Sequence, residues 1–349
     1  MVSRILNSFR RSNMKEWLES LSESENLYFF IGKSSPWNDD NLPPTPTDTF
    51  VDYQEHHKDM LALKKINTVD FVPSTRNIPW EIGTVYDEYD SNDVNLFTTS
   101  KFYVVTADYA VYKCLDNNNG VQSTVEPSGT GTTNITTGDG YVWKYLYTVS
   151  PADVAKFVTP NWIPAYSNST VQAAATDGTV DKINIISGGS GYTTATVNIF
   201  SNTGSGATAT ATISSGVITN ITITDPGTGY KDISITITGN GTGAVLQGVL
   251  PPFGGHGSNI EYELGVKNLL LSVNIVGTET NTFPVDISYR KFGIIVNPLL
   301  ESDGSAAAAS VYSASDIKKG TGEFYYISYT TPIPRSSDDS KNYSFTIAF

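Results

Sequence analysis

The fold is decided by the stretch Gly138-Asp139-Gly140-Tyr141-Val142-Trp143-Lys144-Tyr145-Leu146-Tyr147. Asp-Gly favours a tight turn, and the seven residues after it alternate strictly, with the four aromatic side chains on one side and Val142, Lys144 and Leu146 on the other. This pattern predicts a β-strand with an aromatic face. Because each buried aromatic side chain contributes roughly 2–3 kcal/mol, we expect this face to belong to the core rather than to a ligand platform.

A second predicted strand precedes it, within residues 102–115. The segment between the two is rich in Gly, Thr, Ser and Asn, which favour solvated loops. The two strands are therefore expected to be parts of one antiparallel sheet, joined by a long loop.

The composition limits the class of protein. The chain has 349 residues, enough for two or three domains, and only 16% of them are charged, while Gly, Thr, Ser, Asn and Tyr are abundant. This balance is typical of β-rich extracellular or viral structural proteins. The net charge is −13 and the pI is about 4.6, so phosphate groups would be repelled, which argues against nucleic acid as a partner.

The cysteine content and the hydropathy argue against a disulfide-stabilised, zinc-binding or membrane protein. Cys114 is the single cysteine, so there is no intrachain disulfide and no cysteine-based zinc site, and its place in an alternating segment favours a small buried side chain. No apolar run approaches 18 residues, and the amino terminus lacks the apolar core of a secretion signal. We expect no membrane partner.

The amino-terminal third alternates between helical and extended patterns. Apolar residues at helical spacing predict one or two short amphipathic helices in residues 4–21, followed by a strand at 26–32. Four prolines between residues 36 and 49 predict an extended arm. Residues 50–66 return to helical spacing.

Three clusters suggest chemistry at first sight. His56-His57 could bind metal, but adjacent helical residues point about 100° apart and no third ligand is evident. Residues 87–93 are densely acidic without the calcium-loop pattern, so we expect a solvated or interfacial loop there. His256 near Ser258 lacks the Gly-x-Ser-x-Gly motif, so a structural turn is expected. We predict no catalytic, cofactor-binding or metal-binding residues.

An internal repeat begins near residue 171, where charge almost disappears. Gly189-Ser190-Gly191-Tyr192 matches Gly227-Thr228-Gly229-Tyr230 at an offset of 38, and the flanking strands match at the same offset. Each repeat predicts strand, Gly-x-Gly-Tyr turn, strand, Gly-x-Gly-Ala turn, strand. No Lys-Ser/Thr and no helix follow the glycines, so a phosphate loop is excluded.

These observations predict a mainly β, multi-domain protein with antiparallel, β-sandwich-like sheets. The predicted parts are an N-terminal helical arm (1–25), an N-terminal β domain (26–170), an inserted tandem β-repeat module (171–250) and a C-terminal β segment (251–349) that packs with the 26–170 domain.

Several separated segments together resemble the baseplate wedge protein of T-even-type contractile-tailed phages, the gene product eight family. The segments that carry the resemblance are Phe29-Phe30-Ile31-Gly32-Lys33-Ser34-Ser35-Pro36-Trp37, Pro44-Thr45-Pro46-Thr47-Asp48, Val111-Tyr112-Lys113-Cys114-Leu115-Asp116, residues 138–146, Ile294-Ile295-Val296-Asn297-Pro298-Leu299 and Thr321-Gly322-Glu323-Phe324-Tyr325-Tyr326. The resemblance covers residues 25–165 and 258–349, and the repeat module of 171–250 departs from it.

The resemblance implies a virion structural protein of the tail baseplate, made late in infection and assembled in the host cytoplasm, without catalytic residues or cofactors. It implies a homodimer that contacts neighbouring wedge subunits and links them as a scaffold. The candidate partner-interface residues are Trp17 and Leu21 of the predicted helix and Trp37 and Pro44 of the arm.

Two other functions stay open. A phage tail adhesin or fibre-like module would bind host surface glycans through the Gly/Tyr repeat, and deletion of residues 171–250 would then abolish adsorption without affecting assembly. A glycan-cleaving enzyme would need two paired carboxylates. We place it last, because no Asp/Glu pair stands apart from ordinary surface acids.

Overall fold

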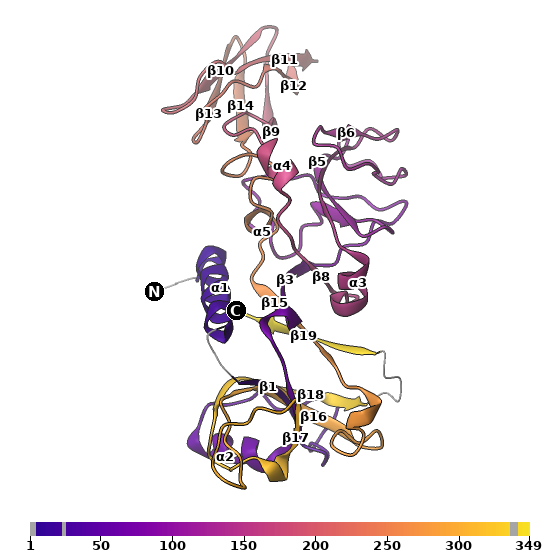
Figure 1. Ribbon diagram of the computed structural model, residues 1–349. Coiled ribbons are helices and arrows are strands. Elements are labelled where there is room, and N and C mark those ends of the chain that lie inside the picture. The colour runs from indigo at the N-terminus through magenta and orange to yellow at the C-terminus, as the bar shows by residue number, and fades with distance from the viewer. Residues whose placement is uncertain (1–4, 23–25, 336–340) are drawn as a thin grey trace. The chain divides into compact units, whose positions relative to one another are not determined.

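The computed structural model describes residues 5–22, 26–335 and 341–349. The described chain is mainly β, with several antiparallel sheets, few helices and one helix near the N-terminus, as the sequence predicted (Figure 1). It divides into two compact units. Unit 1 comprises Met1–Ser74, Ala155–Thr159 and Lys267–Phe349, and unit 2 comprises Thr75–Val154 and Pro160–Val266.

Unit 1 is built on a five-stranded antiparallel sheet in the order β17-β2-β1-β16-β18. The bounds of these strands are β1 Leu27–Gly32, β2 Met60–Lys65, β16 Ser288–Val296, β17 Val311–Ser313 and β18 Glu323–Pro334. Every residue of β1 is buried, because the central strand is covered on both faces. Tyr28, Phe30 and Leu63 form part of the core on one face, and Phe29 stacks on Phe345 of β19 on the other.

A second set of strands completes unit 1. β15 (Asn268–Asn274) pairs with β19 (Asn342–Ala348) on one side and with β3 (Phe71–Arg76) on the other. The helix α1 (Asn7–Ser22) packs here through Trp17, whose ring meets those of Phe71 and Phe349 edge-on at 5.7 and 5.5 Å. The terminal residue is thus held by α1, since Arg10 also donates a hydrogen bond to its carbonyl oxygen.

The predicted helix over 50–66 is wrong in its second half. The helix α2 covers Phe50–Asp59, and the chain then continues directly into β2 at Met60. The apolar spacing of Met60, Ala62 and Leu63 fits a helix and a strand equally well over so short a run. Strand pairing decides between the two, because residues 60–65 pair with β1 as β2, with Leu63 opposite Phe30.

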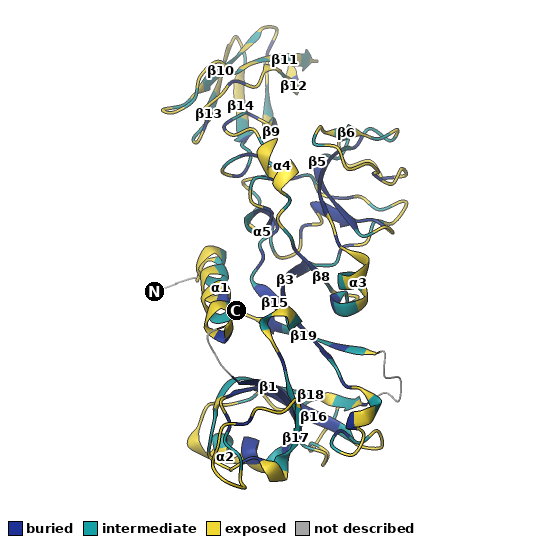
Figure 2. Ribbon diagram, in the orientation of Figure 1, coloured by how far each residue is buried: buried dark blue, intermediate teal, exposed yellow. Residues whose placement is uncertain are grey.

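Unit 2 contains the sheet predicted from the aromatic stretch. Its strands lie in the order β4-β5-β7-β6, and their bounds are β4 Tyr103–Val105, β5 Ala110–Asp116, β6 Ile135–Thr136 and β7 Val142–Thr148. β5 and β7 pair antiparallel, with Cys114 opposite Trp143. Both side chains are fully buried, so Cys114 is a small core residue as expected. Figure 2 shows the buried residues concentrated in strands such as these.

Unit 2 contains three further short elements outside this sheet. They are α4 Ser169–Ala173, α5 Ile260–Glu263 and β8 Trp162–Pro164. The helix α3, Pro151–Phe157, begins at the proline that predicted its first turn and runs from the end of unit 2 into unit 1.

The two sequence repeats form one module of six strands in unit 2. Their bounds are β9 Lys182–Ser190, β10 Ala195–Phe200, β11 Thr208–Ser214, β12 Val217–Asp225, β13 Ser234–Gly239 and β14 Thr242–Val249. Each repeat supplies three strands separated by glycine turns, in the predicted order. Most residues of these six strands are half-buried or exposed, whereas every residue of β1 is buried (Figure 2).

Pairing in the module runs mainly between the repeats, although β10 also pairs with β11 of the same repeat. β11 pairs with β12, β14 with β9, and β10 with β13. The registers repeat as well: Ala209 opposes Ile223 in one pair, and the equivalent Leu246 opposes Ile185 in the other. The two repeats are therefore intertwined, and the first strand of each pairs with the last strand of its counterpart.

The Gly-x-Gly-Ala turn of each repeat fits against the other repeat. A Cβ added at Gly204 would lie 2.4 Å from the Tyr230 ring, and one added at Gly241 would lie 2.4 Å from the Tyr192 ring. Both glycines are thus required by close approach rather than by backbone angle. The apolar side chains between the two sheets, Val180, Ile183 and Tyr230 among them, form the core of the module.

The four predicted domain segments distribute over the two units as follows. Most of 251–349, residues 1–25 and the first part of 26–170 with residues 155–159 are in unit 1, whereas the rest of 26–170 and all of 171–250 are in unit 2. The predicted boundaries near residues 25, 170 and 250 stay predictions.

Candidate partner interface

The proline-rich arm of unit 1 is the part of the chain best suited to contact a partner, and three anchors hold it in place. The first is Trp37, which is half-buried. Its indole Nε1 donates a 3.0 Å hydrogen bond to the carbonyl oxygen of Thr330 in β18, and its ring lies 4.9 Å from that of Tyr329. The Lys33 ammonium lies 4.8 Å from the ring centroid on the arm's own side.

The second anchor is a bidentate ion pair. Arg290 Nε and one terminal nitrogen each donate 2.7 Å hydrogen bonds to the two carboxylate oxygens of Asp40, and the other terminal nitrogen donates to the Ser34 carbonyl oxygen at 2.8 Å. Hydrogen bonding from Arg290 lowers the pKa of Asp40, and the same bond raises the pKa of Arg290. This fork geometry fixes the direction in which the arm leaves β1.

The third anchor is the start of α2. Thr49 caps the helix, accepting a 3.1 Å hydrogen bond from the backbone N–H of Asp52, whose carboxylate accepts from the Thr49 N–H at 3.2 Å in return. Thr47 also donates to this carboxylate, at 2.5 Å, and its hydrogen bond is the main reason why the pKa of Asp52 is lowered.

Several large apolar side chains of the arm and of the first turn of α2 are exposed to solvent. Leu42 is 76% exposed, Phe50 92% and Val51 65%, and Pro44 is exposed beside them. An apolar group held rigidly in water gains nothing for the fold, but it can bury its surface against a partner without a further loss of chain entropy. This surface, Leu42, Pro44, Phe50 and Val51, is called the arm surface below.

The predicted interface residues fall into two groups. Trp37 anchors the arm surface and Pro44 belongs to it. Trp17 is half-buried between Phe71 and Phe349, and Leu21 is 2% exposed, so both pack within unit 1. The exposed apolar side chains near the start of α1 are instead Ile5, Leu6 and Phe9.

Sequence reasoning missed Leu42, Phe50 and Val51. One signal was available for Val51: the half-buried or buried stripe of α2 runs through Tyr53, His56 and His57, and Val51 lies off it. Phe50 lies on the stripe but at the first turn, where α2 has nothing to cover it.

The histidine pair of α2 is part of the core. His56 Nδ1 lies 3.3 Å from the Lys291 ammonium, which also donates a 2.8 Å hydrogen bond to Asp59. Burial and the charge of Lys291 lower the pKa of His56 to about 4. Within residues 5–22, 26–335 and 341–349 no three potential ligands gather in a way that could hold a metal ion.

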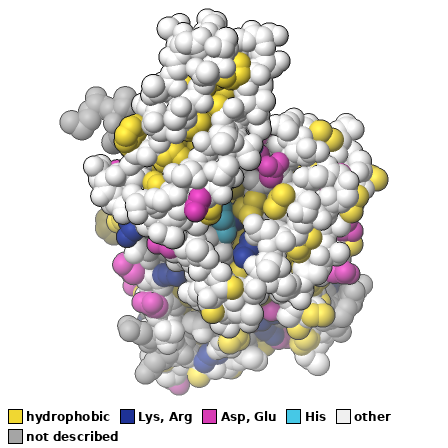
Figure 3. Space-filling model, turned by 90° about the horizontal axis from the view of Figure 1, so that it is seen from above, with side chains coloured by type: hydrophobic (Ala, Val, Ile, Leu, Met, Phe, Trp, Pro, Cys, Tyr) yellow, Lys and Arg dark blue, Asp and Glu magenta, His cyan; other side chains and the backbone are white. Residues whose placement is uncertain are grey.

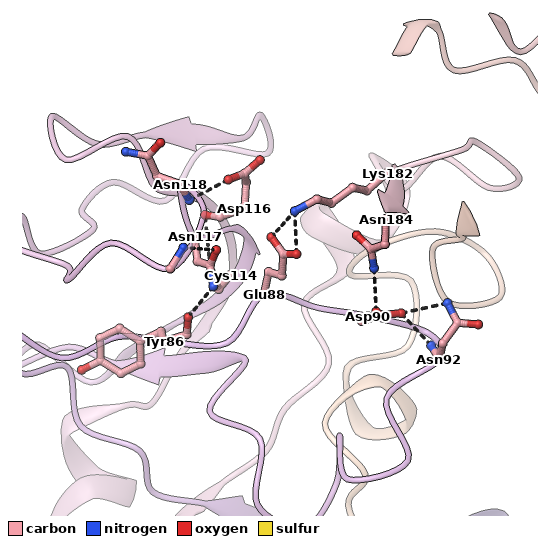
Figure 4. A network of polar contacts seen from close by, with 11 residues as sticks. Tyr86, Glu88, Asp90, Asn92, Cys114, Asp116, Asn117, Asn118, Lys182 and Asn184 are labelled. Carbon is pink, nitrogen blue, oxygen red and sulfur yellow. Dashed lines mark hydrogen bonds and ion pairs between the residues drawn. The ribbon is translucent and has the colours of Figure 1, made fainter. Parts of the chain in front are cut away.

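The acidic segment at 87–93 connects the repeat module to the rest of unit 2, as Figure 4 shows. Lys182 of β9 donates hydrogen bonds of 2.5 and 2.6 Å to the two carboxylate oxygens of Glu88, and the Asn184 amide donates to Asp90 at 2.9 Å. The carboxylates of Glu88 and Asp90 therefore form structural contacts within unit 2. The prediction of a solvated or interfacial loop holds, and the interface is internal.

A buried polar cluster lies behind this connection in unit 2. Lys113 of β5 forms an ion pair with Glu263, both side chains being fully buried. Glu263 also accepts hydrogen bonds from the N–H groups of Gly257, at 2.7 Å, and Asn259, at 3.2 Å. Burial lowers the pKa of Lys113. Nearby, His256 Nε2 lies 2.7 Å from Asp181, so the glycine-rich turn around His256 is structural.

The surface has few charges. Figure 3 shows one face on which uncharged side chains dominate and charged ones are scattered. None of the helices in the described ranges combines the length and the hydropathy that a membrane crossing requires.

Residues 117–238 match the family model described as Phage-Gp8, Bacteriophage T4, Gp8. This confirms the predicted resemblance, although over a different range, because the match includes most of the repeat module, for which no resemblance was predicted. A search of curated proteins finds no match.

Proposed function

We propose that this chain is a structural protein of the virion tail baseplate, a homodimeric scaffold that links neighbouring wedge proteins. The match of residues 117–238 to the phage Gp8 family model supports the baseplate role. The family is structural rather than enzymatic. The arm surface of unit 1 is the observation that carries the linking role, because three anchors hold Leu42, Phe50 and Val51 exposed.

The dimer is tested by light scattering of the purified chain, alone and mixed with the other wedge proteins of the same phage. We expect a dimer that shifts to a larger complex of fixed stoichiometry when a partner is added. A monomer that stays unchanged in every mixture would contradict the proposal.

The role of the arm surface is tested by the double variant Leu42→Ser with Phe50→Ser. Both side chains are already in solvent, so we expect the free energy of unfolding to change by no more than about 0.5 kcal/mol. Complex formation with the wedge partner should weaken at least tenfold, roughly 1.4 kcal/mol. Val94→Ser is the matched control, because Val94 is 81% exposed in unit 2.

One observation favours the alternative of glycan binding. A pocket of about 350 Å³ in unit 2 has Tyr230 and Lys231 of the module on one side and Tyr89, Phe253 and Tyr262 on the other. Aromatic rings combined with polar groups suit a sugar ring. Host glycans applied to the purified chain would have to bind there, and Phe253→Ala would have to weaken that binding.

A further inference from the structure

The outer edge of β18 is unusual among the edges of this fold. β18 is twelve residues long, lies at the end of its sheet, and carries Phe324, Tyr325, Tyr326 and Tyr329. The edge strands β17, β4 and β6 have two or three residues, and the longer edge strands β13, β19 and β12 have six, seven and nine, so β18 is the longest edge strand among the described residues. Proteins normally keep edge strands short or covered, because an open edge pairs readily with another chain.

Contacts within unit 1 cover the two ends of this edge and leave its middle open. Trp37 donates to the Thr330 carbonyl oxygen near one end, and the Tyr53 hydroxyl donates to the Gly322 carbonyl oxygen just before the other, at 2.6 Å. Between them, residues 326–329 pair regularly with β16, with irregular pairing on either side. In the part of the chain that the structure describes, no strand pairs with the outer side of β18.

A groove of about 320 Å³ runs beside this open run. One wall is residues 46–49 of the arm with Asp52, Tyr53 and His56 of α2, and the other is residues 324–327 of β18. The groove therefore lies beside the edge of the sheet, and one of its walls belongs to the arm that also carries Leu42 and Pro44.

The groove is lined by acids. Asp48 and Asp52 line it, and Asp48 makes no ion pair with any described residue. Burial raises the pKa of Tyr329 near its end, and the negative charges of Asp52, Glu55 and Asp59 raise it further. The nearby Lys291 is buried and already paired with Asp59, so it does not neutralise the groove.

We propose that a short extended segment of another wedge protein, carrying Lys or Arg, adds as a sixth strand to the outer edge of β18 at residues 324–329. This inference rests on the proposed scaffold function and names the kind of partner that the scaffold binds. Backbone hydrogen bonds to the edge supply the affinity, and a basic side chain against Asp48 supplies the selection. A second copy of β18 fits less well, since it would bring Glu323 and another acidic groove against the first.

The test is amide hydrogen exchange of the full chain, free and within assembled wedges. In an antiparallel edge strand alternate N–H groups face outward, so about half of the amides in residues 323–330 should exchange quickly in the free protein. We expect those amides to exchange at least tenfold more slowly in the wedge.

The variant Asp48→Lys tests the charge. It should lose most of this protection and weaken wedge binding about tenfold, whereas Asp286→Lys, the same change on an exposed residue outside the groove, should do neither.

The outcomes separate the two proposals. Protection of residues 42–51 without protection of 323–330 overturns the strand addition and leaves the scaffold intact. Failure of the chain to enter wedges overturns the scaffold. If residues 323–330 are protected in the free dimer and lose this protection on dilution, the occupant is a second copy of the chain, and the proposal of a different wedge protein as the partner is overturned.

Discussion

The buried ion pair of Lys113 and Glu263 shows how much one residue can decide in a protein with so few charges. Both side chains are inaccessible to water, and the remaining oxygen of Glu263 is held by two backbone N–H groups. A buried ion pair is tolerated because each charge stabilises the other, whereas a single buried charge is strongly destabilising because its hydration is lost and nothing replaces it.

We therefore expect Lys113→Met to lower the free energy of unfolding by about 3–5 kcal/mol, measured by urea titration. Adding Glu263→Gln should recover part of the loss, because the orphaned charge is removed. Lys231→Met, the same change on an exposed lysine of unit 2, should stay within about 0.5 kcal/mol. Equal effects of the two lysine variants would show that the pair is not a structural one.

A pH dependence follows from His56. Burial and the Lys291 charge lower its pKa to about 4, against an ordinary value of 6.5. The unfolded chain thus binds more protons between these values, so stability should fall as the pH decreases from about 6.5 to about 4. Urea midpoints measured across this range should be flatter for His56→Gln than for the wild type. Part of the slope should remain, because burial also lowers the pKa of His57.

At the scale of elements, the repeat module depends on the exchange of strands between its halves. The glycines that face Tyr192 and Tyr230 make this possible, because a Cβ at Gly204 or Gly241 would overlap the ring of the other repeat. Because the two strand pairs have equivalent registers, substitutions at equivalent positions of the two repeats should lower the free energy of unfolding by similar amounts.

Gly204→Ala and Gly241→Ala should each lower the free energy of unfolding by about 1–3 kcal/mol, since the ring must move to make room. Gly131→Ala is the control, because the nearest atom to its Cβ is 3.9 Å away. Thermal or urea unfolding measures all three. A large cost at one of the two repeat positions and none at the other would refute the equivalence of the halves.

Sequence patterns predicted the elements whose signals are local. Strict alternation in 141–147 was enough for β7, and the offset of 38 was enough for the six strands of the module. The end of α2 was missed, because Met60 and Leu63 fit two periods and their pairing partner, β1, is distant in sequence. Strand order also depends on pairing between segments that are distant in sequence. The sequence alone therefore could not predict that β18 lies at an open edge.

The candidate interface could be predicted from the sequence only in part. Proline content located the arm with Trp37 and Pro44, but exposure depends on what the fold leaves uncovered. Leu42 and Phe50 have the composition of core residues and stand in solvent, whereas Leu21 was expected at the surface and is buried.

At the scale of the whole molecule, the module is attached in a way that allows its removal. Its two ends meet where the Asp181 N–H donates a 3.0 Å hydrogen bond to the Val249 carbonyl oxygen. A short Gly-Ser linker can therefore replace residues 182–248 without stretching the chain. The partly exposed ion pair of Glu88 and Lys182 that is lost is worth about 0–1 kcal/mol.

We expect this deletion to leave the rest of unit 2 folded, with a single unfolding transition and unchanged binding to wedge partners, because the arm surface and β18 belong to unit 1. The deletion distinguishes the two candidate functions, because a scaffold would keep both wedge assembly and adsorption, whereas an adhesin would keep assembly and lose attachment to the host. Light scattering with wedge proteins and adsorption of phage carrying the deletion measure the two separately. Loss of wedge binding by a folded deletion variant would place a partner contact on the module itself, and the linking role would then have to move from unit 1 to unit 2.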